Sequence, residues 1–196
     1  MNPIILASAS PRRQEILTLA GIPFVVAPAA REFAPAGLPP EQRVQALAHS
    51  KAAQVAPLYP GQITLGSDTM VAVDDRVLGK PHSPEEAVEM LLLLQGRTHR
   101  VLTGVWLMVA DAAGSAVKES GFTDIAEVEF YPMTRQEAAD YVATGEPMDK
   151  AGAYGIQGNG MRFVRGIRGD FYTVMGLPGG KTVRVLSDFA AETNFL

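Results

Sequence analysis

The sequence predicts a mixed α/β fold, with a central sheet flanked by helices. Helical and strand patterns alternate along the first half of the chain, and two long strand patterns then follow one another at residues 98–110 and 117–131. No internal repeat or low-complexity segment interrupts the 196 residues, of which 47% are hydrophobic. We therefore expect a single domain over residues 1–196.

The N-terminal elements form a strand, loop and helix unit. Residues 3–7 are mostly apolar, as in a buried strand. Ser10 followed by Pro11 supplies an N-cap and a first helical residue typical of a helix start, and this helix is expected to stop at Gly21. A short strand at 24–27 follows, before a loop that contains several prolines.

The middle of the chain predicts a helix and then a hairpin. The helix over residues 40–55 carries apolar side chains on one face, and Lys51 lies on the same stripe. The hairpin joins a strand at 63–73 to a return strand at 76–79 through a turn at Asp74-Asp75.

Capping residues mark the later helices. Ser83 precedes a proline and two glutamates, which predicts a helix that runs to Gln95. Thr134 caps a helix that ends at Gly145, and a last helix is expected over residues 178–191.

Composition excludes several classes of function. The net charge of -4 argues against a broad surface for nucleic acid or for an anionic membrane. Without cysteine the chain has no disulfide, thiolate zinc site or cysteine nucleophile. The apolar run after Pro3 is too short for a signal peptide, and no apolar stretch approaches the length of a membrane span. We expect a cytoplasmic protein in which functional positive charge is clustered.

Arg12 and Arg13 fall in the first turn of a helix, where each cation opposes the helix dipole and costs up to about 0.3–1 kcal/mol. A bound anion would reverse that sign, since free N–H groups, the Ser8 and Ser10 hydroxyls and two guanidinium groups all suit a phosphate. The alternative is two solvated arginines on an exposed turn. The functional interpretation is a phosphate site in which both arginines serve ligand binding more than stability.

Asp68 is a carboxylate inside an apolar strand, so it needs a partner. The expected hairpin register puts Thr69 opposite Lys80, and Lys80 then reaches Asp68 if the ladder bulges or frays at Gly79. One interpretation is a structural ion pair that closes the hairpin. The other is a functional pair, in which Asp68 binds metal or accepts a proton and Lys80 binds phosphate.

Residues 145–158 are rich in glycine and carry the polar side chains of Asp149, Lys150 and Gln157. Glycine lets a backbone approach a ligand closely, although glycine-rich crossovers that merely turn a corner are common. The sequence contains neither a P-loop nor a nucleophile elbow, so the chemistry of those motifs is not expected.

Six blocks occur in the order of one known family and cover nearly the whole chain. They are Ser10-Pro11-Arg12-Arg13, Gly66-Ser67-Asp68-Thr69, Leu78-Gly79-Lys80-Pro81, residues 146–157, Gly169-Asp170-Phe171-Tyr172 and Met175-Gly176-Leu177-Pro178. Jointly they resemble the Maf family of nucleoside triphosphate pyrophosphatases. The resemblance implies a fold of the inosine triphosphatase type with a cleft between two lobes, a divalent-metal requirement, and a cytoplasmic, often homodimeric enzyme. It also implies hydrolysis between the α and β phosphates, which releases a nucleoside monophosphate and pyrophosphate.

The resemblance also implies roles for matching residues. Asp68 falls on the proton-accepting aspartate, with Lys80 as its catalytic partner, and Glu32 falls on an acidic residue near the metal. Phosphate-binding cations fall on Arg12, Arg13, Lys51, Lys80 and Lys150. An ordinary aspartate is ionised at pH 7 but is a poor base. Asp68 therefore either has a raised pKa or holds a Mg²⁺ or Mn²⁺ ion that lowers the pKa of the attacking water.

Three positions resemble the branch of the family that acts on dTTP and UTP: Arg12, Thr69 and Gln157. The branch that acts on 7-methylguanosine triphosphate has a bulky aromatic residue, Gln and Glu there. A Gln amide offers a donor and an acceptor, which match the imide edge of a pyrimidine. We expect a housecleaning enzyme for pyrimidine triphosphates.

Two other classes of function remain open. A nucleotide-binding regulator of septum formation with vestigial hydrolysis is suggested by the family's link to that process. Nucleic-acid binding is disfavoured, because the sequence has no basic stripe with interleaved aromatic residues.

Overall fold

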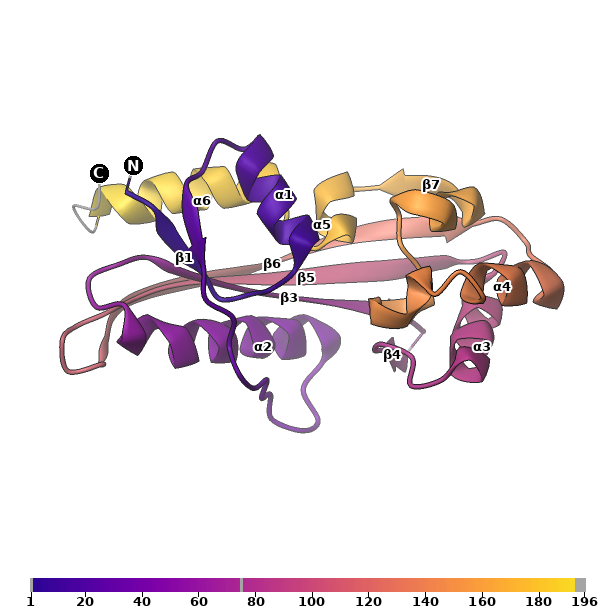
Figure 1. The fold of residues 1–196 in the computed structure, drawn as a ribbon, viewed down its shortest axis with the longest axis horizontal. Coiled ribbons are helices and arrows are strands. Elements are labelled where there is room, and N and C mark those ends of the chain that lie inside the picture. The colour runs from indigo at the N-terminus through magenta and orange to yellow at the C-terminus, as the bar shows by residue number, and fades with distance from the viewer. Residues whose placement is uncertain (1, 75, 193–196) are drawn as a thin grey trace. The chain divides into compact units, whose positions relative to one another are not determined.

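The computed structural model describes residues 2–74 and 76–192 (Figure 1). Its strands are β1 (Ile4–Leu6), β2 (Phe24–Val26), β3 (Thr64–Val73), β4 (Arg76–Leu78), β5 (Thr98–Ala110), β6 (Ala116–Phe130) and β7 (Val164–Arg168). Its α-helices are α1 (Pro11–Leu19), α2 (Pro40–Val55), α3 (Pro84–Leu94), α4 (Arg135–Val142), α5 (Phe171–Met175) and α6 (Gly179–Glu192). Short 3₁₀ segments are η1 (Ala56–Leu58), η2 (Glu146–Asp149), η3 (Ala151–Ala153) and η4 (Gly158–Phe163). Within the described ranges, no helix is both long and apolar enough to cross a membrane.

The strands of the described residues form one mixed sheet in the order β2-β1-β3-β5-β6-β7, and β4 pairs with β3. Strand β1 is parallel to β2 and β3, whereas the β3–β4 and β6–β7 pairs are antiparallel. This sheet with its helices confirms the predicted mixed α/β class.

The chain forms two compact units. Unit 1 comprises Met1–Asp68, Thr103–Asp124 and Gly176–Leu196, and unit 2 comprises Thr69–Leu102 and Ile125–Met175. Strands β3, β5 and β6 each contribute residues to both units.

In unit 1, α2 covers one face of the sheet, and α1 and α6 lie on the other face (Figure 1). Two glycines let α2 approach its strands closely. A Cβ atom on Gly66 of β3 would lie 2.1 Å from the Ala48 carbonyl oxygen, and one on Gly104 of β5 would lie 2.6 Å from the Val44 carbonyl oxygen. Side chains at these positions would therefore separate the helix from the sheet.

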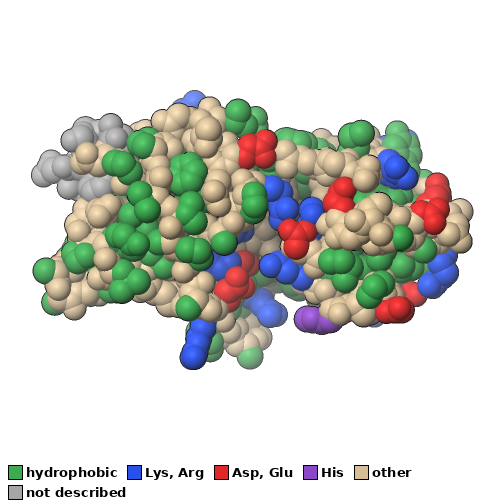
Figure 2. All heavy atoms as spheres, viewed as in Figure 1, with side chains coloured by type: hydrophobic (Ala, Val, Ile, Leu, Met, Phe, Trp, Pro, Cys, Tyr) green, Lys and Arg blue, Asp and Glu red, His purple; other side chains and the backbone are tan. Residues whose placement is uncertain are grey.

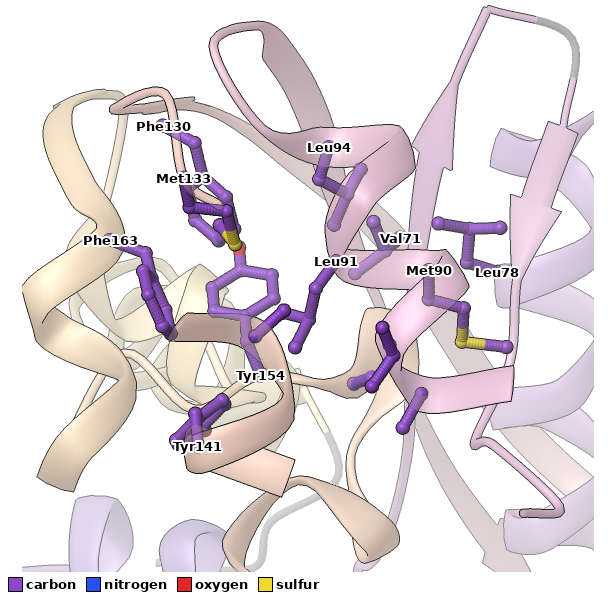
Figure 3. Close-up of a cluster of buried hydrophobic side chains, with 14 of the residues drawn as sticks. Val71, Leu78, Met90, Leu91, Leu94, Phe130, Met133, Tyr141, Tyr154 and Phe163 are labelled. Carbon is purple, nitrogen blue, oxygen red and sulfur yellow. The ribbon is translucent and has the colours of Figure 1, made fainter. Parts of the chain in front are cut away.

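Unit 2 has its own hydrophobic core, which Figure 3 shows around Leu91, Phe130 and Tyr154. His99 of β5 is buried in this unit, where its Nε2 lies 2.8 Å from the Tyr154 hydroxyl oxygen. Its ring meets Phe130 edge to face, with the ring centroids 4.8 Å apart. Burial lowers the pKa of His99 to about 4, so this imidazole is neutral near pH 7.

Most predicted elements are confirmed with small shifts at their ends. The predicted bounds 40–55 and 98–110 coincide with α2 and β5. Ser83 caps α3 by accepting a hydrogen bond from the Glu86 N–H, and Thr134 forms a capping box with Glu137. The β3–β4 register is also as predicted from Val73 opposite Arg76 onward. In the predicted Asp74-Asp75 turn, Asp74 has φ 50°, and Asp75 lies outside the described residues.

The differences lie mainly in the last third of the chain. Strand β7, helix α5 and the segments η2 to η4 were not predicted. Strand β7 pairs with β6, and the register of this pair shifts between Glu129 and Phe130. Three of its five residues are exposed and the other two are half-buried. A strand this short, in which Val164 and Ile167 do not alternate with a period of two, has no pattern by which to recognise it.

Charges of both signs are interspersed on the face drawn in Figure 2, where Lys and Arg side chains lie among Asp and Glu side chains. Cations that bind a phosphorylated ligand must therefore be sought as individual clusters.

Candidate functional site

The Lys51 ammonium group in unit 1 joins two carboxylates. Its Nζ atom lies 2.6 Å from Asp68 Oδ1 and 2.9 Å from Glu32 Oε1, and it donates to the Ser67 carbonyl at 3.3 Å. The side chains of Lys51 and Asp68 are 8% and 14% exposed, whereas Glu32 is 56% exposed. The two carboxylates and the carbonyl compensate the buried ammonium for its lost hydration.

The position of Lys51 follows from the pattern of α2. The buried residues Val44 and Ala48 precede it on the face of the helix that packs against the sheet. Lys51 continues this face, so its side chain extends along the sheet to Asp68, which lies in β3.

Hydrogen bonds to α2 align the loop that carries Glu32. The Gln54 side chain accepts from the Arg31 N–H at 3.1 Å and donates to the Arg31 carbonyl at 2.7 Å. The Ser50 hydroxyl accepts from the Phe33 N–H at 3.3 Å. Because these bonds fix the residues on both sides of Glu32, the carboxylate is held beside the helix.

Arg13 is a second buried cation of unit 1. Its Nε donates to the Gly176 carbonyl at 2.9 Å and its Nη1 donates to the Ser8 hydroxyl at 2.8 Å. The Ser67 hydroxyl donates to the same Gly176 carbonyl at 3.2 Å. Burial lowers the pKa of Arg13, and the negative charge of Asp68 acts in the opposite direction. These contacts connect the end of β1, the middle of β3 and the segment before α6.

Within unit 1, Asp68 has a cationic partner that the hairpin register did not predict. The cation bonded to Asp68 is Lys51, and the β3–β4 ladder ends at Leu78, before Lys80. Hairpin register does not reveal this partner, because Lys51 comes from a helix that packs across the strand.

The surroundings of the two arginines differ. Arg13 is buried and bonded within its own unit, so it is also a structural residue, whereas Arg12 is half-buried. Ser10 is the N-cap residue of α1, but its side chain makes no cap hydrogen bond, and its N–H donates to the Ser8 hydroxyl at 3.3 Å.

The remaining residues marked by the sequence lie in unit 2. Thr69 follows Asp68 in β3, Lys80 is exposed after β4, and Gln157 is exposed before η4. The Lys150 ammonium donates to the Asp149 carboxylate at 2.6 Å.

A backbone contact joins two of the marked segments of unit 2. The Gly152 N–H donates to the Gly79 carbonyl at 3.0 Å, which places the segments that bear Lys80 and Lys150 side by side. A Cβ atom on Gly152 would lie 2.9 Å from the Val71 side chain, so glycine is required for this close packing.

Carboxylate oxygens near Lys51 fit a hard divalent cation. The described residues contain no group of three or more His, Cys, Asp or Glu side chains that could hold a metal ion. The carboxylates of Asp68 and Glu32 nevertheless converge on a single Nζ atom. Mg²⁺ at nucleotide sites is commonly held by one or two carboxylates together with substrate phosphates and water, so this pair fits such an ion.

A mixed α/β sheet that carries buried cations beside a pair of carboxylates is suited to a phosphorylated ligand and its divalent cation. The family described as Maf-like protein matches residues 3–189, so this chain belongs to the Maf family.

Its relatives match it over nearly their whole length. The chain is 50% identical over 190 residues to a dTTP/UTP pyrophosphatase of Symbiobacterium thermophilum, covering 96% of this chain and 95% of the relative. It is 49% identical over 190 residues to a protein of the same name from Bacillus cytotoxicus, covering 96% of each. A dTTP/UTP pyrophosphatase of Bacillus velezensis is 46% identical over 187 residues, which are 95% of this chain and 96% of that protein.

Proposed function

We propose that this chain hydrolyses dTTP and UTP to the nucleoside monophosphate and pyrophosphate, as a housecleaning enzyme of the cytoplasmic nucleotide pool. The observation that carries the proposal is the identity of 46–50% over essentially the full chain with relatives named dTTP/UTP pyrophosphatase. The family resemblance further suggests a homodimer, which light scattering would test.

The phosphates are proposed to be bound by cations from several segments. The family resemblance assigns this role to Arg12 and Arg13 at the start of α1, to Lys51 in α2, and to Lys80 and Lys150. A triphosphate concentrates negative charge, so catalysis of its cleavage depends largely on positioning and on electrostatic stabilisation. These cations would both position the triphosphate and stabilise its charge. They would do so as a local cluster, because the net charge of the protein is -4.

Asp68 is proposed to promote attack by water. The water adds to one phosphorus atom of the α–β bridge, and the bridging oxygen leaves with the other phosphorus. Asp68 accepts the proton of that water, while Lys51, at 2.6 Å, holds the carboxylate in place. Asp68 and Glu32 would hold a Mg²⁺ or Mn²⁺ ion together with phosphate oxygens, and this ion would lower the pKa of the water and screen phosphate charge.

Base selection is assigned to Arg12, Thr69 and Gln157. The Gln157 side chain is exposed and makes no cap hydrogen bond to η4, so its amide is available to a ligand. A site whose polar groups lack partners with the wrong base can discriminate strongly against it.

The test is pyrophosphate release from dTTP, UTP, CTP, GTP, ITP and 7-methyl-GTP under one Mg²⁺ condition. We expect the highest kcat/KM for dTTP and UTP, and a purine that is better by about tenfold would overturn the base assignment. Nucleotide binding without release from any of them would instead favour a nucleotide-binding regulator.

A chelator tests the metal requirement separately. We expect excess EDTA to stop pyrophosphate release and added Mg²⁺ or Mn²⁺ to restore it, because the candidate ligands are hard oxygen atoms. Undiminished release from protein shown to be free of metal would refute the metal-assisted mechanism.

A further inference from the structure

The Glu146 carboxylate in unit 2 accepts three hydrogen bonds. The Tyr141 hydroxyl donates to Oε1 at 2.9 Å, the Gly160 N–H donates to Oε1 at 3.1 Å, and the Asn159 N–H donates to Oε2 at 2.9 Å. Burial acts to raise the pKa of Glu146, but these bonds outweigh it and the pKa lies below its ordinary value. The carboxylate is therefore ionised near neutral pH and accepts at both oxygens.

These hydrogen bonds replace a cap that Gln157 does not provide. Gln157 is the N-cap residue of η4, and the side chain of an N-cap residue commonly accepts from the N–H groups of the second or third residue of the helix. Here Glu146 accepts from those two groups, on Asn159 and Gly160, while Gln157 makes no side-chain cap bond. Glu146 therefore caps η4, and among the described residues the Gln157 amide is not used for this cap.

The residues on both sides of Gln157 are fixed by the same network. The Tyr141 hydroxyl accepts from the Gly155 N–H at 3.1 Å while it donates to Glu146. Tyr141 is itself anchored in the core of unit 2, where its ring packs edge to face against Phe163 (Figure 3). The backbone is thus held two residues before Gln157 and two residues after it.

Gly158 shows that this arrangement depends on close approach. Its φ is +75°, and a Cβ atom there would lie 2.8 Å from Glu146 Oε2. A glycine is needed both for the backbone conformation and to admit the carboxylate.

We propose that Glu146 is a positioning residue for pyrimidine selection, which acts by holding the backbone around Gln157 and by freeing its amide for the base. The inference rests on the proposed function, because it assigns Glu146 to the reading of the substrate's base. Without the carboxylate, the N–H groups of Asn159 and Gly160 lose their acceptor, and the orientation of Gln157 is no longer fixed.

The primary test is Glu146→Gln. This variant keeps the size of the side chain but turns an NH₂ group toward a backbone N–H donor. We expect the ratio of kcat/KM for dTTP to that for GTP to fall by about tenfold, because discrimination depends on placing polar groups precisely. Hydrogen exchange at the Asn159 and Gly160 amides should accelerate in the same variant.

Glu137→Gln is the matched control. Glu137 also accepts hydrogen bonds in unit 2, from the Thr134 N–H at 2.7 Å and the Thr134 hydroxyl at 2.8 Å, but it caps α4. We expect its loss to leave the dTTP/GTP ratio within about twofold of wild type. A control that relaxes selectivity as much as Glu146→Gln would show a general structural effect and overturn the proposal.

A double-mutant cycle tests whether Glu146 acts through Gln157. If it does, Glu146→Gln in a Gln157→Ala background should change the dTTP/GTP ratio by less than about twofold, since the group that it positions is already gone. Full additivity of the two losses would overturn the proposal. Tyr141→Phe, which removes one of the three donors, serves as a milder second variant if Glu146→Gln does not fold.

The failures of the two proposals are distinguishable. Wild-type protein that releases no pyrophosphate from dTTP overturns the proposed function, and the inference falls with it. Wild-type protein that prefers dTTP, together with a Glu146→Gln variant of unchanged selectivity, overturns the inference alone.

Discussion

Asp68 combines a structural role with a chemical one, because its carboxylate neutralises the buried Lys51 ammonium at 2.6 Å and is also the proposed proton acceptor. Removal of one partner of a buried ion pair leaves the other charge poorly compensated. The exposed Glu32 carboxylate at 2.9 Å remains for Lys51 in that case. Loss of Asp68 should therefore weaken the fold without abolishing it, and its effect on catalysis must be separated from its effect on stability.

We expect Asp68→Asn to lower kcat by about 100-fold or more, the size typical of a general base or a metal-binding group. Thermal unfolding should shift to a lower Tm while circular dichroism shows a retained fold. Asp124→Asn is the control, since that carboxylate pairs with the more exposed Lys181 at 3.1 Å and should leave kcat within about twofold. Retention of more than about a tenth of the wild-type kcat by Asp68→Asn would remove Asp68 from the catalytic role.

The two neighbouring arginines should respond differently to truncation. Arg13→Ala should lower the free energy of unfolding by about 1–3 kcal/mol, because the buried Ser8 hydroxyl and Gly176 carbonyl lose a charged donor. Arg12→Ala should leave the Tm unchanged or raised, since its charge opposes the dipole of α1, while it raises the KM for dTTP. Urea unfolding and initial rates measure the two effects. Equal destabilisation by the two substitutions would contradict this division of roles.

At the scale of elements, the contact between α2 and β3 sets the distance from Lys51 to Asp68. Lys51 lies between Ala48 and Ala52, and a Cβ atom on Gly66 would lie 2.1 Å from the Ala48 carbonyl oxygen and 2.8 Å from the Ala52 nitrogen. Both of these are backbone atoms, which cannot rotate away. Any side chain at Gly66 must therefore displace the helix turn that bears Lys51.

Gly66→Ala should destabilise the protein by about 2 kcal/mol through overpacking. It should also lower kcat, because the lysine moves relative to the carboxylate that it holds. Gly180→Ala in α6 is the control, since a Cβ atom there meets nothing within 4 Å. Chemical unfolding and pyrophosphate release measure the two effects. A Gly66→Ala variant as stable and active as Gly180→Ala would show that the helix position is not critical.

Elements with local signals were predictable from the sequence. Helices α3 and α4 have capping residues at Ser83 and Thr134, and α2 has an apolar stripe, so their starts were found. Strand β7 and the 3₁₀ segments depend on partners distant in the sequence and carry no periodic pattern of their own.

For the cluster of Lys51, Asp68 and Glu32, the residues could be marked from the sequence but their pairing could not. Asp68 and Lys51 were both marked, yet their contact depends on a helix packing across a strand through Gly66, which no local spacing reveals. Glu146 was missed as a positioning residue for a similar reason. Its carboxylate acts on N–H groups 13 and 14 residues away, and the donors are backbone groups that every sequence contains.

At the scale of the whole molecule, the strands that belong to both units determine whether the chain unfolds in one transition. Strands β3, β5 and β6 contribute residues to both units, so loss of either unit breaks strands of the other. We therefore expect one cooperative transition. His99 in unit 2 and Trp106, the single tryptophan, in unit 1 make this testable.

Stability should fall as the pH drops from about 6.5 to about 4. Burial lowers the pKa of His99 to about 4, against 6.5 for an ordinary histidine, so in this range the unfolded chain binds a proton that the folded chain does not. The loss attributable to His99 is at most about 3 kcal/mol, and it fades out by about pH 7.5, where the histidine is neutral in both states.

His99→Gln should flatten this part of the pH profile, whereas His82→Gln, at an exposed position, should leave it unchanged. Urea unfolding at pH 7.5 and 5 is followed by Trp106 fluorescence and by circular dichroism. Midpoints are compared, because the imidazole of His49 lies 4.9 Å from the Trp106 ring and alters its intensity directly. If the transition is cooperative, protonation of His99 in unit 2 shifts the urea midpoint that Trp106 fluorescence reports from unit 1. A circular dichroism midpoint that moves while the Trp106 midpoint stays fixed would show instead that the units unfold separately.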